Sequence, residues 1–195
     1  MAARLALAAP DTLLLLEHPP TITLGRRGSL ADVFVTEGER VRRGIALHHT
    51  SRGGLVTYHG PGQLVAYPIL RPRDLGRTIP QYVRGLERTV VAALGAVGVA
   101  AHVDEAHVGV WTSRGKIAAI GVGQTHGVTR HGFAVNLQPE LRNFALINPC
   151  GIGDLGVTSA ATLLGHPVDM ALFKRLVADA FQAEFGYDGR DRTLM

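Results

Sequence analysis

Helical signals in this chain are confined to two segments that lie far apart, and short strand signals fill most of the remaining sequence. The first helix is expected to begin at the capping box of Thr78 and Gln81 and to run to about Val99. The second is expected to begin after the N-cap residue Asp169 and to end at Gly186. Because the strand segments follow one another instead of alternating with helices, a regular doubly wound fold is excluded. The pattern predicts the α+β class, with a mixed, largely antiparallel β-sheet flanked by helices.

The expected strands are short runs of β-branched or apolar residues bounded by glycine, proline or charged residues. They span residues 12–16, 21–24, 55–58, 63–69, 108–111, 116–122 and 133–137. Pro61 and Gly62 suit a type II turn, so a hairpin or tight loop is expected there. The charged segment 36–43 is expected to be a loop. The core-facing residues of the last helix are expected to be Leu172, Leu176, Ala180 and Phe181.

Size and composition predict one globular domain covering residues 1–195, because the sequence contains no internal repeat and no long linker. Cys150 is the single cysteine, which forbids an intramolecular disulfide and fits a reducing compartment. No apolar run approaches the roughly 18 residues that span a bilayer. We therefore expect a cytoplasmic protein with no membrane partner.

The formal net charge is +4, which would suit nucleic acid or an acidic protein partner. The four Tyr, six Phe and one Trp do not interleave with basic residues as they do on single-strand-binding surfaces, so no nucleic-acid partner is expected. Arginine supplies nearly all the cations, and the exceptions are Lys116 and Lys174. Lysine can give up a proton near neutral pH, whereas arginine cannot.

The sequence gives little indication of a nucleotide site or of a metal site. Gly121 and Gly123 follow an apolar stretch, but the next glycine is Gly127, one residue too late for a dinucleotide loop, and a hairpin turn is favoured. The phosphate-loop pattern is absent. The nine histidines lack the spacing of a metal-binding pair, so no metal site and no cofactor are expected.

Three residues could carry chemistry, and each has a plainer alternative. Cys150 lies between Pro149 and Gly151, and it suits either a buried apolar residue or a nucleophile. Lys116 could be a solvated residue at a strand end or the cation that lowers the pKa of a thiol. His59 opens a glycine-rich turn, and it could be a turn residue or a ligand contact.

Taken together, six segments in this order closely resemble the lipoyl(octanoyl) transferase family. They are Glu17-His18-Pro19-Pro20, residues 52–63 (RGGLVTYHGPGQ), residues 115–121 (GKIAAIG), residues 131–136 (HGFAVN), residues 147–151 (INPCG) and Val157-Thr158-Ser159. The resemblance implies the fold of biotin and lipoate protein ligases and of the class II aminoacyl-tRNA synthetase core. Family members usually carry a further strand and helix before the first of these segments, so the N-terminal element here is expected to be short.

The resemblance also implies roles for individual residues. Cys150 matches the acyl-thioester nucleophile of the family, and Lys116 matches the lysine that lowers its pKa. The implied acyl-substrate contacts are Arg52, Gly53, Gly54, Leu55, Val56, Thr57, Tyr58, His59, Ala119, Ile120, Gly121, Gly132, Phe133 and Ala134.

The implied reaction is transfer of an octanoyl group from octanoyl-acyl carrier protein to the ε-amine of a lysine on a lipoyl domain. The implied acceptors are the lipoyl domains of 2-oxoacid dehydrogenase complexes and the glycine cleavage H protein. Exchange of one thioester for another requires no ATP. An ATP-dependent lipoate or biotin protein ligase is the alternative. Exposed arginines would dock the acidic carrier protein, and the candidates are Arg26, Arg27, Arg40, Arg42, Arg43, Arg71, Arg73 and Arg77.

Overall fold

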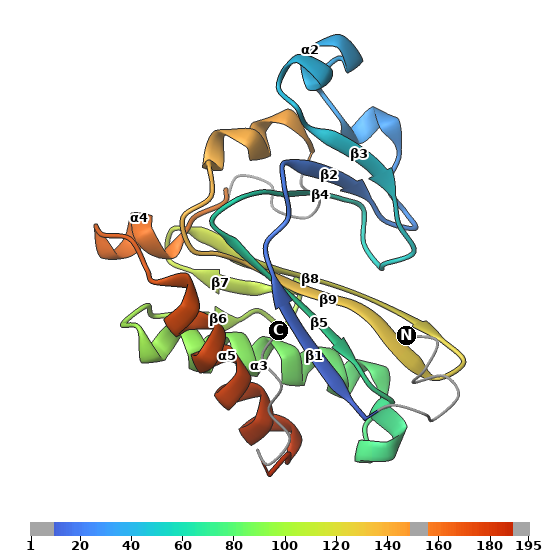
Figure 1. Ribbon diagram of the computed structural model, residues 1–195, viewed down its shortest axis with the longest axis vertical. Coiled ribbons are helices and arrows are strands. Elements are labelled where there is room, and N and C mark those ends of the chain that lie inside the picture. Colours follow the sequence, from blue (N-terminus) through green and yellow to red (C-terminus); the bar gives the residue numbers. More distant parts are fainter. Residues whose placement is uncertain (1–9, 149–155, 189–195) are drawn as a thin grey trace.

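The computed structural model describes residues 10–148 and 156–188, which form two β-sheets with helices on the outside (Figure 1). The larger sheet has six strands, all paired antiparallel. Their order is β1 (Thr12–Leu16), β5 (Gln63–Ile69), β9 (Val128–Asn136), β8 (Gly115–Thr125), β7 (Val110–Thr112) and β6 (His102–Val103). The smaller sheet has the order β3 (Ala46–His49), β2 (Thr21–Leu24) and β4 (Val56–His59), in which β2 and β3 are parallel. The predicted α+β class with a mixed, largely antiparallel sheet is confirmed.

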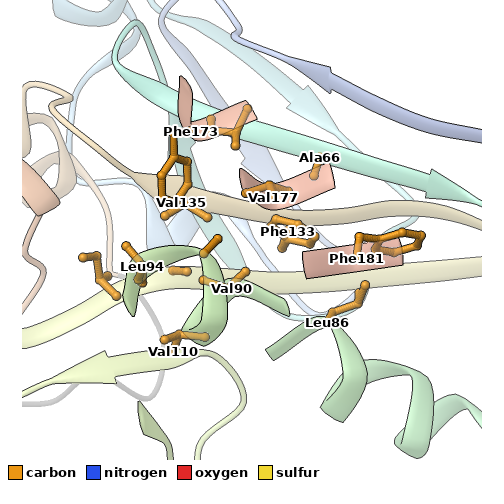
Figure 2. Packing of buried hydrophobic residues seen from close by; sticks show 14 of the residues in the cluster. Ala66, Leu86, Val90, Leu94, Val110, Phe133, Val135, Phe173, Val177 and Phe181 are labelled. Carbon is orange, nitrogen blue, oxygen red and sulfur yellow. The ribbon is translucent and has the colours of Figure 1, made fainter. Parts of the chain in front are cut away.

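Two long helices, α3 (Ile79–Ala96) and α5 (Met170–Phe185), cover one face of the larger sheet (Figure 1). Figure 2 shows Leu86 and Val90 of α3 and Phe181 of α5 packed against strand residues such as Phe133. These side chains are almost fully buried, and each contributes roughly 1.5–3 kcal/mol through removal of its apolar surface from water. None of the helices in residues 10–148 and 156–188 is long and apolar enough to cross a membrane.

A second, smaller core lies on the face of the three-stranded sheet that points away from the larger sheet, and it includes Ile22, Tyr58 and Phe144. The short elements of the described chain are α2 (Glu37–Arg42), α4 (Ala160–Leu164), η1 (Leu30–Asp32), η2 (Pro72–Leu75) and η3 (Leu141–Leu146). Because each sheet packs its outer face on its own core, the facing surfaces of the two sheets are left to line the space between them.

The helix ends follow the local signals in the sequence. Thr78 and Gln81 form the predicted capping box of α3, and Asp169 accepts a hydrogen bond from the backbone of Leu172 at the start of α5. Gly186 ends α5 in the left-handed conformation with φ 77°. The first helix ends at Ala96, slightly before the predicted Val99.

One expectation about local structure was wrong, and a second was only partly confirmed. Segment 36–43 contains helix α2, because the side chain of Thr36 caps its first turn and the acidic and basic residues suit the two helix ends. On α5, Phe173 and Val177 face the core with Phe181, whereas Leu172 is 41% exposed. The buried stripe is centred on the phenylalanines, and the expected Leu176 and Ala180 pack partly buried at its edge, so the expected face was rotated by about one residue.

The turn at Gly60–Gly62 does not join a hairpin. Gly62 has φ 82°, as a type II turn requires, but β4 pairs with β2 whereas β5 pairs with β1 and β9. The hairpin lies instead between β8 and β9, where His126 and Gly127 both have positive φ and Thr125 pairs with Val128. Gly121 and Gly123 lie inside β8, which excludes a dinucleotide loop there.

The chain therefore passes between the two sheets at two glycine- or proline-rich points. Pro19 and Pro20 separate β1 from β2, and the glycine turn separates β4 from β5. Both crossings lie at the same junction, so the smaller sheet is held over the inner face of the larger one (Figure 1).

Candidate active site

A cavity of about 630 Å³ lies between the two sheets. Its walls come from β2 and β4 of the smaller sheet and from β5, β8 and β9 of the larger one. Residues implied by the family resemblance supply much of the lining. They are Lys116, Arg52, Gly53, Gly54, Leu55, Val56, Thr57, His59, Ala119, Ile120, Gly121, Gly132, Phe133 and Ala134.

The structure does not place Tyr58 at the cavity. Successive side chains of a strand point to opposite faces, so Tyr58 lies away from the cavity while His59 lies at it. The Tyr58 ring packs edge-on against Phe144, and its hydroxyl accepts a hydrogen bond from Asn143 Nδ2 at 2.9 Å. Cys150, the predicted nucleophile, lies outside the described residues.

Lys116 lies near the start of β8 with its side chain held in place. Its Nζ donates to the carbonyl oxygen of Val108 at 2.9 Å and lies 5.0 Å from the ring centre of Trp111. Its backbone pairs with the chain that follows residues 149–155, because its N–H donates to the carbonyl of Gly156 and its carbonyl accepts from Thr158. Val157, in between, lines the cavity.

Glycines allow the backbone to form one wall of the cavity. The loop at Gly53 lies against β8, where its N–H donates to the carbonyl of Val122 at 2.8 Å. A Cβ at Gly121 would lie only 3.1 Å from the carbonyl oxygen of Gly53. A Cβ at Gly132 would collide with the carbonyl oxygen of Ala66. Side chains at these positions would force the backbone segments apart.

Arg52 fastens the same loop to the smaller sheet. Its guanidinium donates to the carbonyl oxygen of Thr23 at 2.6 Å, to the Thr23 hydroxyl at 2.9 and 3.2 Å, and to the carbonyl of Gly53 at 3.0 Å. The residue is only 9% exposed, so its charge acts on the cavity with little screening by water.

Sequence patterns did not single out several polar residues of the cavity as site residues. His18 Nε2 lies 2.6 Å from the hydroxyl of Tyr67, and His131 Nε2 lies 3.1 Å from that of Ser51. His131 also has a φ of 59° within β9, a strained conformation for a residue with a side chain. His18 and His131 fall in segments that carried the family resemblance, but no periodicity or spacing distinguished them.

Burial lowers the pKa values of His18, His59 and His131, which line the cavity. Burial, helped by the neighbouring charge of Arg52, lowers the pKa of His59 to about 4. The described residues that line the cavity include Arg27, Arg52 and Lys116 but no Asp or Glu. Across residues 10–148 and 156–188 no group of three or more His, Cys, Asp or Glu is arranged to hold a metal ion.

Comparison with known proteins assigns the class. Residues 1–182 match the family model described as the lipoyl protein ligase A/B catalytic domain. An octanoyltransferase of Chloroflexus aggregans is 49% identical over 172 residues, which cover 86% of this chain and 78% of that relative. An octanoyltransferase of Alkaliphilus metalliredigens is 42% identical over 179 residues, covering 91% and 82% of the two chains. The chain therefore belongs to the lipoyl protein ligase A/B catalytic domain family, and within it to the octanoyltransferases, which are acyltransferases.

Solved structures agree on the fold. A lipoate-protein ligase A structure with bound ATP superposes with a TM-score of 0.80 at 17% identity, over 96% of this chain and 77% of that one. The biotin protein ligase of Aquifex aeolicus, in complex with biotin and ATP, superposes with a TM-score of 0.57 at 15% identity, over 84% and 70% of the two chains. The expected likeness to lipoate and biotin protein ligases is thus confirmed.

Proposed function

We propose that this octanoyltransferase, as a single catalytic domain of residues 1–195, works through an acyl-enzyme on Cys150. The donor is octanoyl-acyl carrier protein, and the acceptor is the ε-amine of a lysine on a lipoyl domain. The observation that carries the proposal is the fixed ammonium of Lys116 at a cavity whose described lining contains no carboxylate. A cation held at such a site favours a thiolate.

In the first half-reaction the Cys150 thiolate attacks the carbonyl carbon of the donor thioester. A new C–S bond forms to the enzyme, the bond to the donor sulfur breaks, and that sulfur leaves as a thiolate that takes up a proton. One thioester replaces another of similar energy, so no ATP is consumed. Lys116 stabilises the attacking thiolate by its charge.

In the second half-reaction the neutral amine of the acceptor lysine attacks the acyl-enzyme. The C–N bond forms, the C–S bond breaks, and the amide nitrogen loses one proton. Lys116 relays this proton to the sulfur of Cys150, a step that an arginine could not perform. Two half-reactions that share one covalent intermediate give ping-pong kinetics.

The acyl chain would lie against the apolar part of the cavity, which includes Val65, Ile120 and Phe133. Burial of an eight-carbon tail contributes up to about 5 kcal/mol at about 0.8 kcal/mol for each methylene. The length of this apolar part would therefore set the preferred chain length.

The acceptors would be lipoyl domains of 2-oxoacid dehydrogenase complexes and the glycine cleavage H protein, with the enzyme in the cytoplasm. The acidic carrier protein would dock on exposed arginines, of which Arg26 and Arg27 lie beside the cavity loop. Arg77 is better explained otherwise, because it pairs with Glu184 at 2.7 Å and lies over the Phe185 ring. Arg77 therefore anchors α5, and we remove it from the candidate residues for docking the carrier protein.

The test is intact mass spectrometry after incubation with octanoyl-acyl carrier protein in the absence of ATP. We expect an octanoyl adduct on the wild-type protein and none on the Cys150→Ser variant. An unmodified wild-type protein with intact donor would contradict the proposal. Acylation of a lipoyl domain that requires ATP and free octanoate would identify an ATP-dependent ligase instead.

A further inference from the structure

A buried chain of amide groups leads from His59 to the backbone beside Lys116. His59 Nδ1 lies 2.8 Å from Gln63 Oε1, and Gln63 Nε2 lies 2.9 Å from Asn136 Oδ1. Asn136 Nδ2 then donates to the carbonyl oxygen of Thr158 at 3.1 Å. Gln63 and Asn136 are register partners on β5 and β9, and both are at least 95% buried.

Carbonyl groups, which can only accept, fix the direction of each hydrogen bond that links His59 to Thr158 through the two amide side chains. Since the carbonyl of Thr158 takes a proton from Asn136 Nδ2, the Asn136 Oδ1 atom faces Gln63 and accepts from its Nε2. The carbonyl of Tyr58 accepts from the same Nε2 at 3.1 Å. Gln63 Oε1 is therefore an acceptor, and the hydrogen of a neutral His59 ring must lie on Nδ1.

The other ring nitrogen of His59 consequently carries a lone pair. It lies 3.5 Å from the Thr23 hydroxyl, which is the long limit for a hydrogen bond. That hydroxyl accepts two hydrogen bonds from Arg52. His59 Nε2 thus offers the cavity a hydrogen-bond acceptor that is only weakly engaged.

The chemistry of the two half-reactions indicates what would use such an acceptor. The octanoyl chain and its thioester have no N–H or O–H group, whereas the attacking lysine amine has two N–H bonds. The charges of Arg52 and Lys116, with no carboxylate among the described lining residues, favour the neutral and nucleophilic form of that amine. Thr158 donates its N–H to the carbonyl of Lys116, so the amide chain and the lysine belong to one hydrogen-bonded framework.

We propose that His59 accepts a hydrogen bond at Nε2 from the attacking lysine amine and so directs its lone pair at the thioester, with Gln63 and Asn136 as positioning residues that fix the ring tautomer. This role rests on the acyl-enzyme mechanism proposed above, and Lys116 still relays the proton. No proton is transferred to His59, which only orients the amine.

The tautomer is measured directly on the wild-type protein. Two-bond ¹⁵N–¹H correlation spectra near pH 7, with the His59 signals assigned from the His59→Gln variant, should show a neutral ring with its proton on Nδ1. A proton on Nε2, or a charged ring, would overturn the proposal whatever the enzyme activity.

The role of Nε2 is tested by comparing two substitutions in separate half-reactions. His59→Asn keeps a donor to Gln63 and loses the acceptor, whereas His59→Gln places an oxygen near the position of Nε2. Relative to wild type, the ratio of the transfer rate to the acylation rate should fall roughly tenfold or more in His59→Asn, as expected for loss of a hydrogen bond to a reacting group. In His59→Gln the ratio of the transfer rate to the acylation rate should return much of the way to the wild-type value. Equal ratios in both variants and wild type would refute the role.

Gln63→Met tests the positioning residue, with Gln124→Met at an exposed site of β8 as the matched control. The Gln63 variant should show a mixture of His59 tautomers and a lower transfer-to-acylation ratio, and the control should show neither. A folded Gln63 variant that keeps the Nδ1 proton and the wild-type ratio would remove Gln63 from the proposal. Absence of any acyl-enzyme in the wild type would instead contradict the proposed function, and the tautomer result would stand by itself.

Discussion

The carboxylate of Glu87, which is fully buried on α3, accepts a hydrogen bond from the backbone N–H of Gly109 at 2.8 Å. Its other oxygen pairs with Arg84, whose guanidinium also donates to the carbonyls of Asp104 and Glu105. Residues 104–109 are thereby tied to the helix. The same loop presents the carbonyl of Val108 to Lys116, so one helix on the far side of the sheet fixes the position of the site lysine.

Glu87→Ala should lower the free energy of unfolding by about 3 kcal/mol, because it leaves a partly buried cation and a buried N–H without this partner. The matched control is Glu39→Ala, which removes exposed ion pairs to Arg42 and Arg43 and should cost less than about 1 kcal/mol. Urea unfolding measures both values. Equal losses in the two variants would show that the Glu87 contacts add no stability.

Lys116→Arg should abolish most turnover while the fold is retained. Arginine keeps the positive charge but cannot release the proton that the relay requires, so we expect turnover to fall by roughly 10²–10⁴-fold. Steady-state transfer to a lipoyl domain and thermal unfolding provide the two measurements. Near-normal turnover would contradict the relay.

Gly132→Ala should destabilise the protein by roughly 2 kcal/mol, because the added methyl group collides with the backbone of β5 at Ala66. Gly95→Ala is the matched control on α3, where a Cβ would meet nothing within 4 Å and alanine raises helix propensity. It should stabilise the protein by about 0.5 kcal/mol. Urea midpoints that move in the same direction for both variants would be inconsistent with this account.

The stability of the protein should fall on acidification because of His59. Its pKa is about 4 in the folded protein against an ordinary value of 6.5. Above pH 6.5 both states are neutral, and between the two values only the unfolded state binds the proton. The free energy of unfolding should therefore decrease by about 1.4 kcal/mol for each pH unit in that window. His59→Gln should flatten the slope and exposed His166→Gln should not. An unchanged slope in the first variant would show that His59 is protonated when folded.

Arg26→Glu should slow acylation by the carrier protein roughly threefold at low salt, with a smaller effect at high salt, if exposed arginines steer the acidic donor. Arg175→Glu on α5, on the far side of the larger sheet, is the control with the same charge change. Stopped-flow acylation at several salt concentrations provides the measurement. A wild-type rate that does not depend on ionic strength would eliminate the docking hypothesis.

Features that depend on interactions between residues close in the chain could be predicted from the amino-acid sequence. The capping box at Thr78, the stop at Gly186 and the type II turn at Gly62 are of this kind, and each lies where the sequence predicts it. The ordered motifs also identify the family, because their residue types and spacing are properties of the sequence alone. Helix α2 was not predicted, because its six residues do not repeat apolar side chains at helical spacing.

Features that depend on contacts between distant segments required the folded chain. Strand signals cannot say which sheet a strand joins, so the separation of β4 from β5 followed only from their pairing partners. The same pairing turned Tyr58 away from the cavity and brought His18, His59 and His131 to it from three separate segments. Gln63 and Asn136 are 73 residues apart in sequence, and only their register on adjacent strands allows them to fix one histidine proton.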